Sequence, residues 1–237
     1  MLEKCAVDIA VIPARGGSKR IPRKNTKLFG GKPIIAWSIE AALASGCFDR
    51  IIVSTDDDEI ADVARVFGAE VPYRRPAELS DDFCPTAPVI AHAVKEAARS
   101  APVRRACCVY ATAPFIRPRD LRVGLRALDR TESDFAFSVT RYPYAIQRAL
   151  RLDARNRVSM FDPKHGETRS QDLEDAYHDA GQFYWGTAQA WISDKPIFSP
   201  RSVGIPLPRV RVQDIDTIDD WAQAELMFRA LGSSIEV

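Results

Sequence analysis

Short apolar runs alternate with segments of helical apolar spacing over the first 140 residues of the chain. Apolar runs of about four to eight residues bounded by turn residues are typical of buried strands, and they predict strands at 7–12, 50–54, 70–73, 106–110 and 135–140. Helical spacing predicts helices between them, at 34–43, 57–67, 88–98 and 118–128. This alternation predicts parallel β-α-β units, and hence an α/β fold with a doubly wound, mostly parallel sheet.

The regular alternation ends at Arg141, where aromatic, charged and proline-containing segments take over until about Pro200. We interpret residues 141–200 as an insertion. Regular signals return at 205–212, and a last helix is predicted from about Thr217 to Leu231. The 237 residues therefore form a single domain, 1–237, that carries one insertion.

Charge and cysteine content narrow the classes of partner. The 33 Lys and Arg residues balance 32 Asp and Glu residues, so no overall field draws the protein to nucleic acid or to an anionic membrane surface. No apolar run approaches the ~20 residues of a membrane span. The five cysteines form no C-x-x-C pair, and their odd number favours a reducing cytoplasm.

The loop after the first strand, residues 13–25, is rich in glycine and positive charge. In an open parallel sheet, ligands bind beyond the carboxyl ends of the strands. The adjacent glycines Gly16 and Gly17 let backbone N–H groups approach a phosphate, and Arg15, Lys19 and Lys24 can neutralise a triphosphate. The pattern lacks G-x-x-x-x-G-K-[ST] and the third glycine of G-x-G-x-x-G. A solvated basic surface loop is the alternative interpretation.

Two aspartates, Asp214 and Asp216, are separated by one residue. In an extended segment both carboxylates face the same side and can share a hard cation such as Mg²⁺. The alternative is that one of them caps the last helix. The acidic run 56–59 lies between a predicted strand and a predicted helix, so we assign it to helix capping and the helix dipole rather than to a metal.

Residues 169–185 hold the densest collection of aromatic, charged and amide side chains. An acidic sugar needs a bidentate cation for its carboxylate, polar groups for hydroxyls and amides, and apolar faces for acetyl methyls. The same composition suits a subunit interface. Within this segment, His178 is a general base by type or a structural histidine. His92 and His165 have no sequence partner that indicates chemistry.

The segment 12–25 resembles the first signature of the cytidylyltransferases that activate sialic acid and related sugars, and the resemblance continues in order through 31–39, 48–56, 75–82 and 213–217. It implies a Rossmann-like nucleotidyltransferase fold with a small dimerisation insertion, in a homodimer. It also implies a Mg²⁺-dependent reaction in which CMP passes from CTP to the anomeric hydroxyl of an acidic nine-carbon sugar, with release of pyrophosphate. Neither nucleic acid nor membrane is an expected partner.

The resemblance also assigns roles to individual residues. The implied catalytic residues are Arg15, Lys24 and Asp216, and the implied metal ligands are Asp214 and Asp216. The implied nucleotide-binding residues are Ala14, Arg15, Gly16, Gly17, Lys24, Asn25, Ser80 and Asp81. The implied sugar-binding residues are Arg169, Gln171, Tyr177 and His178.

Two departures bear on the sugar. Where many sialic acid enzymes have a glutamine, this chain has Ala111, and its segment 177–185 resembles the pseudaminic acid branch instead. The resemblance therefore favours pseudaminic acid. The alternatives are sialic, legionaminic or a shorter keto-deoxy acid and, more remotely, a non-catalytic nucleotide-binding protein of the same fold.

Overall fold

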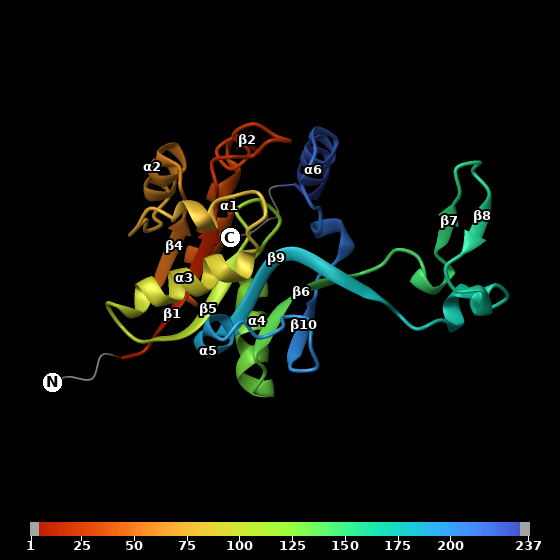
Figure 1. The fold of residues 1–237 in the computed structure, drawn as a ribbon. Helices are drawn as coiled ribbons and strands as arrows, with labels where there is room; N and C mark the ends of the chain where they lie inside the picture. Colours follow the sequence, from red (N-terminus) through yellow and green to blue (C-terminus); the bar gives the residue numbers. More distant parts are fainter. Residues whose placement is uncertain (1–4, 233–237) are drawn as a thin grey trace.

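The structure is a computed structural model that describes residues 5–232. Its centre is a six-stranded sheet in the order β10-β6-β9-β5-β1-β4 (Figure 1). The strands are β1 Val7–Pro13, β4 Arg50–Ser54, β5 Val103–Val109, β6 Phe135–Arg141, β9 Tyr177–Thr187 and β10 Ser202–Pro206. Neighbours pair in parallel except around β9, which is antiparallel to both β5 and β6. The predicted mostly parallel α/β sheet is confirmed.

Helices cover both faces of the sheet. They are α1 Ile34–Ser45, α2 Asp58–Val66, α3 Thr86–Ala98, α4 Pro118–Thr131 and the short α5 Ala188–Ile192. On β1, Ala10 and Ile12 pack in one buried cluster with residues of α1, α2 and α4. Ile9 and Val11 pack in another with residues of α3 and α5. Because successive strand side chains point to opposite faces, an apolar run such as that of β1 builds both clusters.

A third buried cluster joins the last helix, α6 Ile218–Leu231, to the chain that follows the first loop. In it, Phe29 of the short strand β2 (Leu28–Phe29) packs edge-on against Trp221 and Phe228 of α6. The neighbouring strand is β3 Lys32–Pro33. This packing brings the segment before α6 beside the loop after β1, although the two are far apart in sequence.

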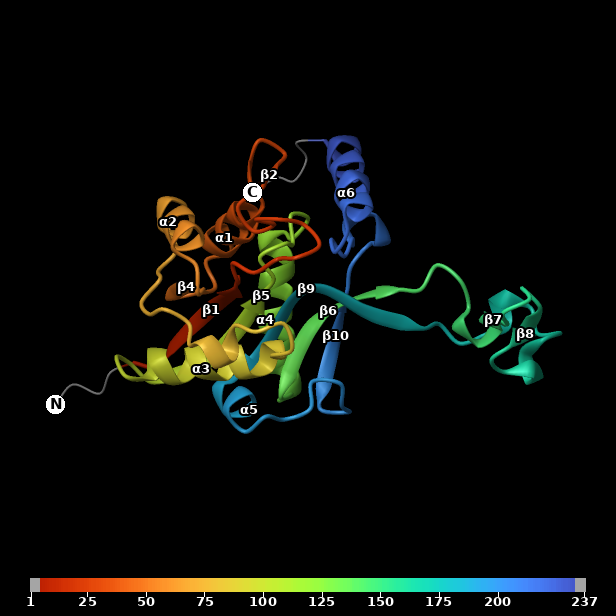
Figure 2. The same cartoon turned by 45° about the horizontal axis from the view of Figure 1, so that its top comes forward.

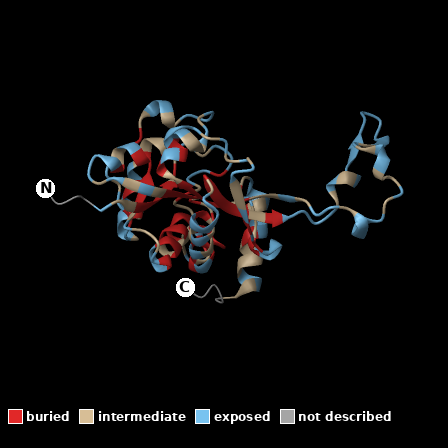
Figure 3. Ribbon diagram, turned by 90° about the horizontal axis from the view of Figure 1, so that it is seen from below, coloured by how far each residue is buried: buried red, intermediate tan, exposed pale blue. Residues whose placement is uncertain are grey.

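A long arm projects from the body between β6 and β9 and carries the small hairpin β7 Leu150–Leu152 and β8 Val158–Met160 (Figure 2). Figure 3 shows that the arm is exposed or half-buried, whereas buried residues fill the sheet region. The projecting segment, 142–176, is narrower than the 141–200 range expected for the insertion. The later part of that range differs because residues 177–187 form β9, which lies in the central sheet.

The strand predicted at 70–73 is wrong. Only isolated bridges form there, Ile52 with Glu70 and Thr55 with Arg74. Pro72 lies between them and has no N–H to donate to a ladder. Within residues 5–232, no helix is long and apolar enough to cross a membrane.

Candidate active site

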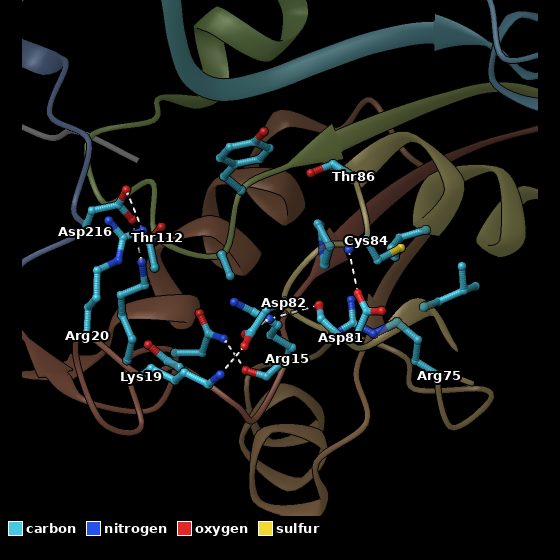
Figure 4. A pocket seen from close by; sticks show the side chains of 18 residues that line it. Arg15, Lys19, Arg20, Arg75, Asp81, Asp82, Cys84, Thr86, Thr112 and Asp216 are labelled. Atoms are coloured by element: carbon cyan, nitrogen blue, oxygen red, sulfur yellow. Dashed lines mark hydrogen bonds and ion pairs between the residues drawn. The ribbon is translucent and has the colours of Figure 1, made fainter. Parts of the chain in front are cut away.

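A cavity of about 510 Å³ opens beyond the carboxyl ends of β1 and β5 (Figure 4). This is the edge at which open parallel sheets bind ligands. Its walls come from the loop after β1, the segment between Arg75 and Val89, and Tyr110, Ala111 and Thr112 after β5. Asp216, which precedes α6, completes the lining. The structure thus places the cavity where the glycine-rich basic loop predicts a ligand.

Four basic side chains of the loop after β1 line this cavity: Arg15, Lys19, Arg20 and Lys24. Arg15 and Lys19 both pair with Asp82, whereas Arg20 and Lys24 lie 2.9 and 3.4 Å from the carboxylate of Asp216. Figure 4 shows Lys19 and Arg15 beside Asp82, and Arg20 beside Asp216. Because exposed ion pairs are weak, a polyphosphate can replace the two carboxylates as counter-ion at little cost.

Neighbouring side chains hold the loop in place. The Gly16 N–H donates to Asp56 Oδ1 at 3.0 Å, and the side-chain amide of Asn25 donates to the Arg15 carbonyl at 3.0 Å. Asn25 also lines the cavity. It therefore both supports Arg15 and faces the space for the ligand. Ala14 is buried and donates its N–H to the Ser54 carbonyl at 3.0 Å. The implied nucleotide residues of this loop therefore include both lining and supporting groups.

The acidic run after β4 caps the next helix. The Asp57 side chain accepts from the Ile60 N–H at 3.0 Å, and Asp58 and Glu59 occupy the first turn of α2. Hydrogen bonds from Arg23 lower the pKa of Asp57, although burial opposes them. The assignment to helix capping and the helix dipole is confirmed for residues 57–59. Asp56 has a different role, because it holds the loop through Gly16.

Ser80 and Asp81 have different roles. Asp81 lines the cavity, and its Oδ1 accepts the N–H groups of Phe83 at 2.9 Å and Cys84 at 2.6 Å. Ser80 follows the 3₁₀ turn Ala77–Leu79, donates to the Pro76 carbonyl and accepts from Arg75 Nε at 3.2 Å. Asp81 thus faces the ligand space, and Ser80 supports Arg75.

Arg75 is a site residue that residue-by-residue reasoning misses. It is only 5% exposed yet lines the cavity. Burial lowers its pKa, while Asp56, 3.5 Å away, opposes that shift. Its Nη2 has no hydrogen-bond partner among the described residues. A buried donor of this kind calls for an acceptor on a ligand. The only sequence signal for it is its place in the block 75–82.

The paired aspartates lie just before α6. Asp216 lines the cavity, and Lys24 Nζ donates to the carbonyl between the two aspartates, that of Ile215, at 2.7 Å. Burial and the charge of Asp216 raise the pKa of Asp214, against the influence of Lys24. Two neighbouring carboxylates, whose negative charges repel each other, offer oxygen ligands that suit a hard cation. No group of three or more such ligands occurs within residues 5–232, so Mg²⁺ held here needs phosphate and water oxygens as well.

Helix capping does not account for these aspartates. Thr217 is the N-cap of α6: its side chain accepts from the Asp220 N–H, and the Asp220 carboxylate accepts from the Thr217 N–H at 2.7 Å. This reciprocal capping box satisfies the helix start. The alternative that Asp214 or Asp216 caps the helix is wrong, and both carboxylates are left for other partners.

The implied sugar residues do not line the cavity within one chain. Arg169 and Gln171 lie on the arm, where Arg169 Nε pairs with Asp172 at 2.7 Å. Tyr177 is half exposed at the start of β9. The His178 Nδ1 lies 2.8 Å from its neighbour's carbonyl, and its ring packs on Tyr142. These four residues stay predictions.

Sequence comparison decides the family. The family model described as cytidylyltransferase matches residues 9–219, which include the loop after β1 and both aspartates before α6. The chain belongs to the cytidylyltransferase family. The predicted enzyme class and fold are therefore confirmed.

Relatives within this family cover the chain almost completely. A pseudaminic acid cytidylyltransferase of Campylobacter jejuni is 46% identical over 223 residues, which is 94% of this chain and 96% of that protein. A CMP-N,N'-diacetyllegionaminic acid synthase of Legionella pneumophila is 34% identical over 229 residues, 92% of this chain and 94% of that protein. A solved CMP:2-keto-3-deoxy-manno-octonic acid synthetase complexed with CTP superposes with a TM-score of 0.69 at 18% identity, covering 94% of this chain and 98% of that one. The last likeness concerns the fold alone.

Proposed function

We propose that this cytidylyltransferase transfers CMP from CTP to the anomeric hydroxyl of pseudaminic acid, giving CMP-pseudaminic acid and pyrophosphate. The observation that carries the proposal is the 46% identity over 94% of the chain to a pseudaminic acid cytidylyltransferase. The cavity supports it, because four cations of the loop after β1 line it together with Asp216 and the buried guanidinium of Arg75, whose Nη2 has no hydrogen-bond partner among the described residues.

In the proposed reaction the sugar hydroxyl attacks the α-phosphorus of CTP in line with the departing pyrophosphate. Arg15 and Lys24 bind the phosphates and stabilise the charge that develops on them, with Lys19 and Arg20 adding to the same field. Asp82 and Asp216, which pair with these cations in the structure, give them up to the triphosphate. No covalent enzyme intermediate is needed.

Asp214 and Asp216 are the proposed magnesium ligands. When bound, Mg²⁺ neutralises charge on the α-phosphate and orients the displacement. Once the triphosphate draws Arg20 and Lys24 away, Asp216 is free to accept a cation. Arg75 then offers its buried Nη2 to an acceptor of the nucleotide, and Asp81 orders the segment beside it.

A homodimer is part of the proposal. The arm exposes large apolar side chains, with Tyr144 at 85%, Leu152 at 66% and Phe161 at 59%. Such patches mark interaction surfaces, and a second copy of the chain is the partner we propose. In this arrangement the arm brings Arg169 and Gln171 to the sugar in the partner's cavity. We also propose a cytoplasmic location, since all five cysteines are unpaired.

A pyrophosphate-release assay tests the function. With CTP and Mg²⁺, we expect pseudaminic acid to give the highest kcat/KM, ahead of legionaminic acid, sialic acid and a shorter keto-deoxy acid, each supplied separately. Because these sugar acids share a carboxylate and differ in stereochemistry, substituents or chain length, we expect the difference to lie mainly in the sugar KM. A preference for legionaminic acid would move the assignment toward the Legionella relative. Absence of pyrophosphate with every sugar would refute enzyme activity.

A further inference from the structure

Arg23 differs from the other cations of the loop after β1. Within residues 13–25, all of which the structure describes, it is the one cation that does not line the cavity. Its guanidinium lies instead against the start of α2. Nη1 and Nη2 donate to Asp57 Oδ2 and Oδ1 at 2.8 and 3.1 Å, and Nη2 also donates to Glu59. Two carboxylates outside the cavity therefore already match its charge.

The backbone of Arg23 is held in an uncommon conformation. Its φ is +55°, in the left-handed region that residues with a side chain seldom adopt. Its carbonyl accepts the N–H groups of Thr26 and Lys27 at 3.0 and 2.9 Å. Such a conformation persists only where the surroundings hold it. Here the turn is fixed through both the backbone and the side chain of Arg23.

Lys24 follows directly, and this turn sets its place. Its side chain is partly buried and reaches the segment before α6, where Nζ donates to the Ile215 carbonyl at 2.7 Å and lies 3.4 Å from the carboxylate of Asp216. The side chains of Arg23 and Lys24 thus extend to different elements. A shift of the backbone at Arg23 would carry Lys24 with it, and a charge-assisted hydrogen bond is sensitive to distance and angle.

The start of α2 is a firm support for this turn. Asp57 is itself fixed, because its Oδ1 also accepts the Ile60 N–H and so caps the helix. An arginine that bonds through two nitrogens to an anchored carboxylate has the geometry in which an exposed ion pair does contribute. Asp56, the residue before, accepts the Gly16 N–H at 3.0 Å. The junction of β4 and α2 therefore holds the loop near both of its ends.

We propose that Arg23 is a positioning residue for Lys24: anchored on Asp57 and Glu59, it fixes the turn from which Lys24 meets the phosphates of CTP. The inference rests on the role of Lys24 in the proposed function, and it does not depend on which sugar accepts CMP. It gives the acidic start of α2 a part in nucleotide binding, although neither carboxylate lines the cavity.

Calorimetric titration with CTP tests the inference without a sugar. We expect Lys24→Ala to weaken binding roughly thirtyfold, the effect of one charge-assisted hydrogen bond. Arg23→Ala should weaken it roughly tenfold, because Lys24 remains but is less well placed. In the Lys24→Ala background, Arg23→Ala should cost less than about twofold more, since the group through which it acts is gone. Arg65→Ala is the matched control, because Arg65 is an exposed arginine that pairs with Asp62 within α2; its affinity should stay within about twofold of wild type.

Two further variants separate the anchor from the turn and from the charge. Arg23→Gly removes the side chain but adopts a positive φ freely, so it should bind CTP as weakly as Arg23→Ala. Asp57→Asn keeps the oxygen that caps α2 and puts an amide N–H where Oδ2 accepts from Arg23. It also removes a negative charge near the loop. Net charge alone would then strengthen CTP binding, whereas loss of the anchor should weaken it roughly fivefold.

The inference is overturned if Arg23→Ala or Arg23→Gly binds CTP as the wild type does, or if Asp57→Asn binds it more tightly. It is also overturned if the effects of Arg23→Ala and Lys24→Ala add in full. Loss of an exposed ion pair should lower the thermal unfolding midpoint by less than about 4 °C, and a larger drop in Arg23→Ala would mean a general loosening of the fold instead.

The same measurements separate this inference from the proposed function. If Lys24→Ala binds CTP as the wild type does, Lys24 is not a phosphate ligand, and the inference fails with that assignment. If no sugar acid gives pyrophosphate while the CTP affinities change as expected, the proposed function fails and the positioning role of Arg23 stands.

Discussion

Gly16 and Gly17 are adjacent in the loop after β1, but the structure gives them different surroundings. A Cβ on Gly16 would lie 2.6 Å from Asp57 Oδ2 and 2.9 Å from its Cβ, whereas a Cβ on Gly17 would meet nothing within 4 Å. We therefore expect Gly16→Ala to destabilise the fold by about 1–3 kcal/mol, as overpacking does. It should also weaken CTP binding, because Arg15 shifts with the loop. Gly17→Ala should stay within about 0.5 kcal/mol of wild type.

Thermal unfolding and calorimetric titration with CTP measure both effects. Equal losses of stability in the two variants would show that contact with Asp57 does not set the loop position. If Gly17→Ala keeps its stability but loses CTP affinity, the open space beside Gly17 is where the backbone approaches a phosphate.

At the residue scale, the sequence predicts the cations of the loop after β1 and the paired aspartates before α6, but not the residues with which they pair. Arg15, Lys24 and Asp216 can be recognised from their residue types and from the order of the segments that contain them. Their arrangement depends on chain distance: Asp82 is 67 residues from Arg15, and Asp216 is 192 from Lys24. Such pairings follow from the packing of whole elements. A buried arginine like Arg75 looks like any surface arginine in a sequence.

At the scale of elements, one buried carboxylate joins β1 to its neighbours. Asp8 accepts from Arg104 and Arg105 of β5 at 2.6 and 2.5 Å, and its N–H donates to Asp49, before β4, at 2.8 Å. Burial alone would raise the pKa of Asp8, but the hydrogen bonds from Arg105 and Arg104 outweigh it and lower the pKa below 3.8. Removing one partner of a buried pair is strongly destabilising, since it leaves charge uncompensated.

We expect Asp8→Asn to lower the free energy of unfolding by about 3 kcal/mol at pH 7. Because the folded-state pKa lies below the unfolded value, the contribution of Asp8 is complete well above pH 3.8 and is lost as pH falls through the folded pKa. The gap between wild type and variant in urea unfolding should therefore narrow below about pH 3.8. Asp129→Asn is the control, because Asp129 pairs with Arg105 from an exposed position. A gap independent of pH would contradict this account.

Helices and strands were predictable where the spacing of apolar residues and the turn or capping residues at the ends indicate the same element. The strand at Arg50–Ser54 and the helix that starts at Pro118 follow from an apolar run and an N-terminal proline. The place of β9 in the central sheet was not predictable in this way, although β9 lies between two strands and is buried at Phe183, Tyr184 and Trp185. A run of three buried aromatics has no alternation, so its sequence looks the same as an interface segment.

At the scale of the whole molecule, the arm raises the question of which cavity it serves. In one chain the implied sugar residues Arg169 and Gln171 lie on the arm, apart from the residues that line the cavity. The arm leaves Leu152 and Phe161 exposed, which a second copy would cover. A symmetric dimer repeats each contact twice, so an arm that reaches across would complete two shared sites.

Co-expression of two differently tagged defective chains tests this arrangement. A chain with Arg169→Ala keeps its cavity but lacks the arm residue. A chain with Asp216→Ala keeps its arm, and we expect it to lose turnover because it lacks a proposed metal ligand. If the arm acts across the dimer, the purified hybrid has one complete site and should recover about half of the wild-type rate at low sugar concentration. Pairing Arg15→Ala with Asp216→Ala should recover nothing, because each chain then has a defective cavity. If the hybrid of Arg169→Ala and Asp216→Ala is as inactive as this control, the arm serves its own chain. If Arg169→Ala alone is as active as the wild type, Arg169 has no part in sugar binding.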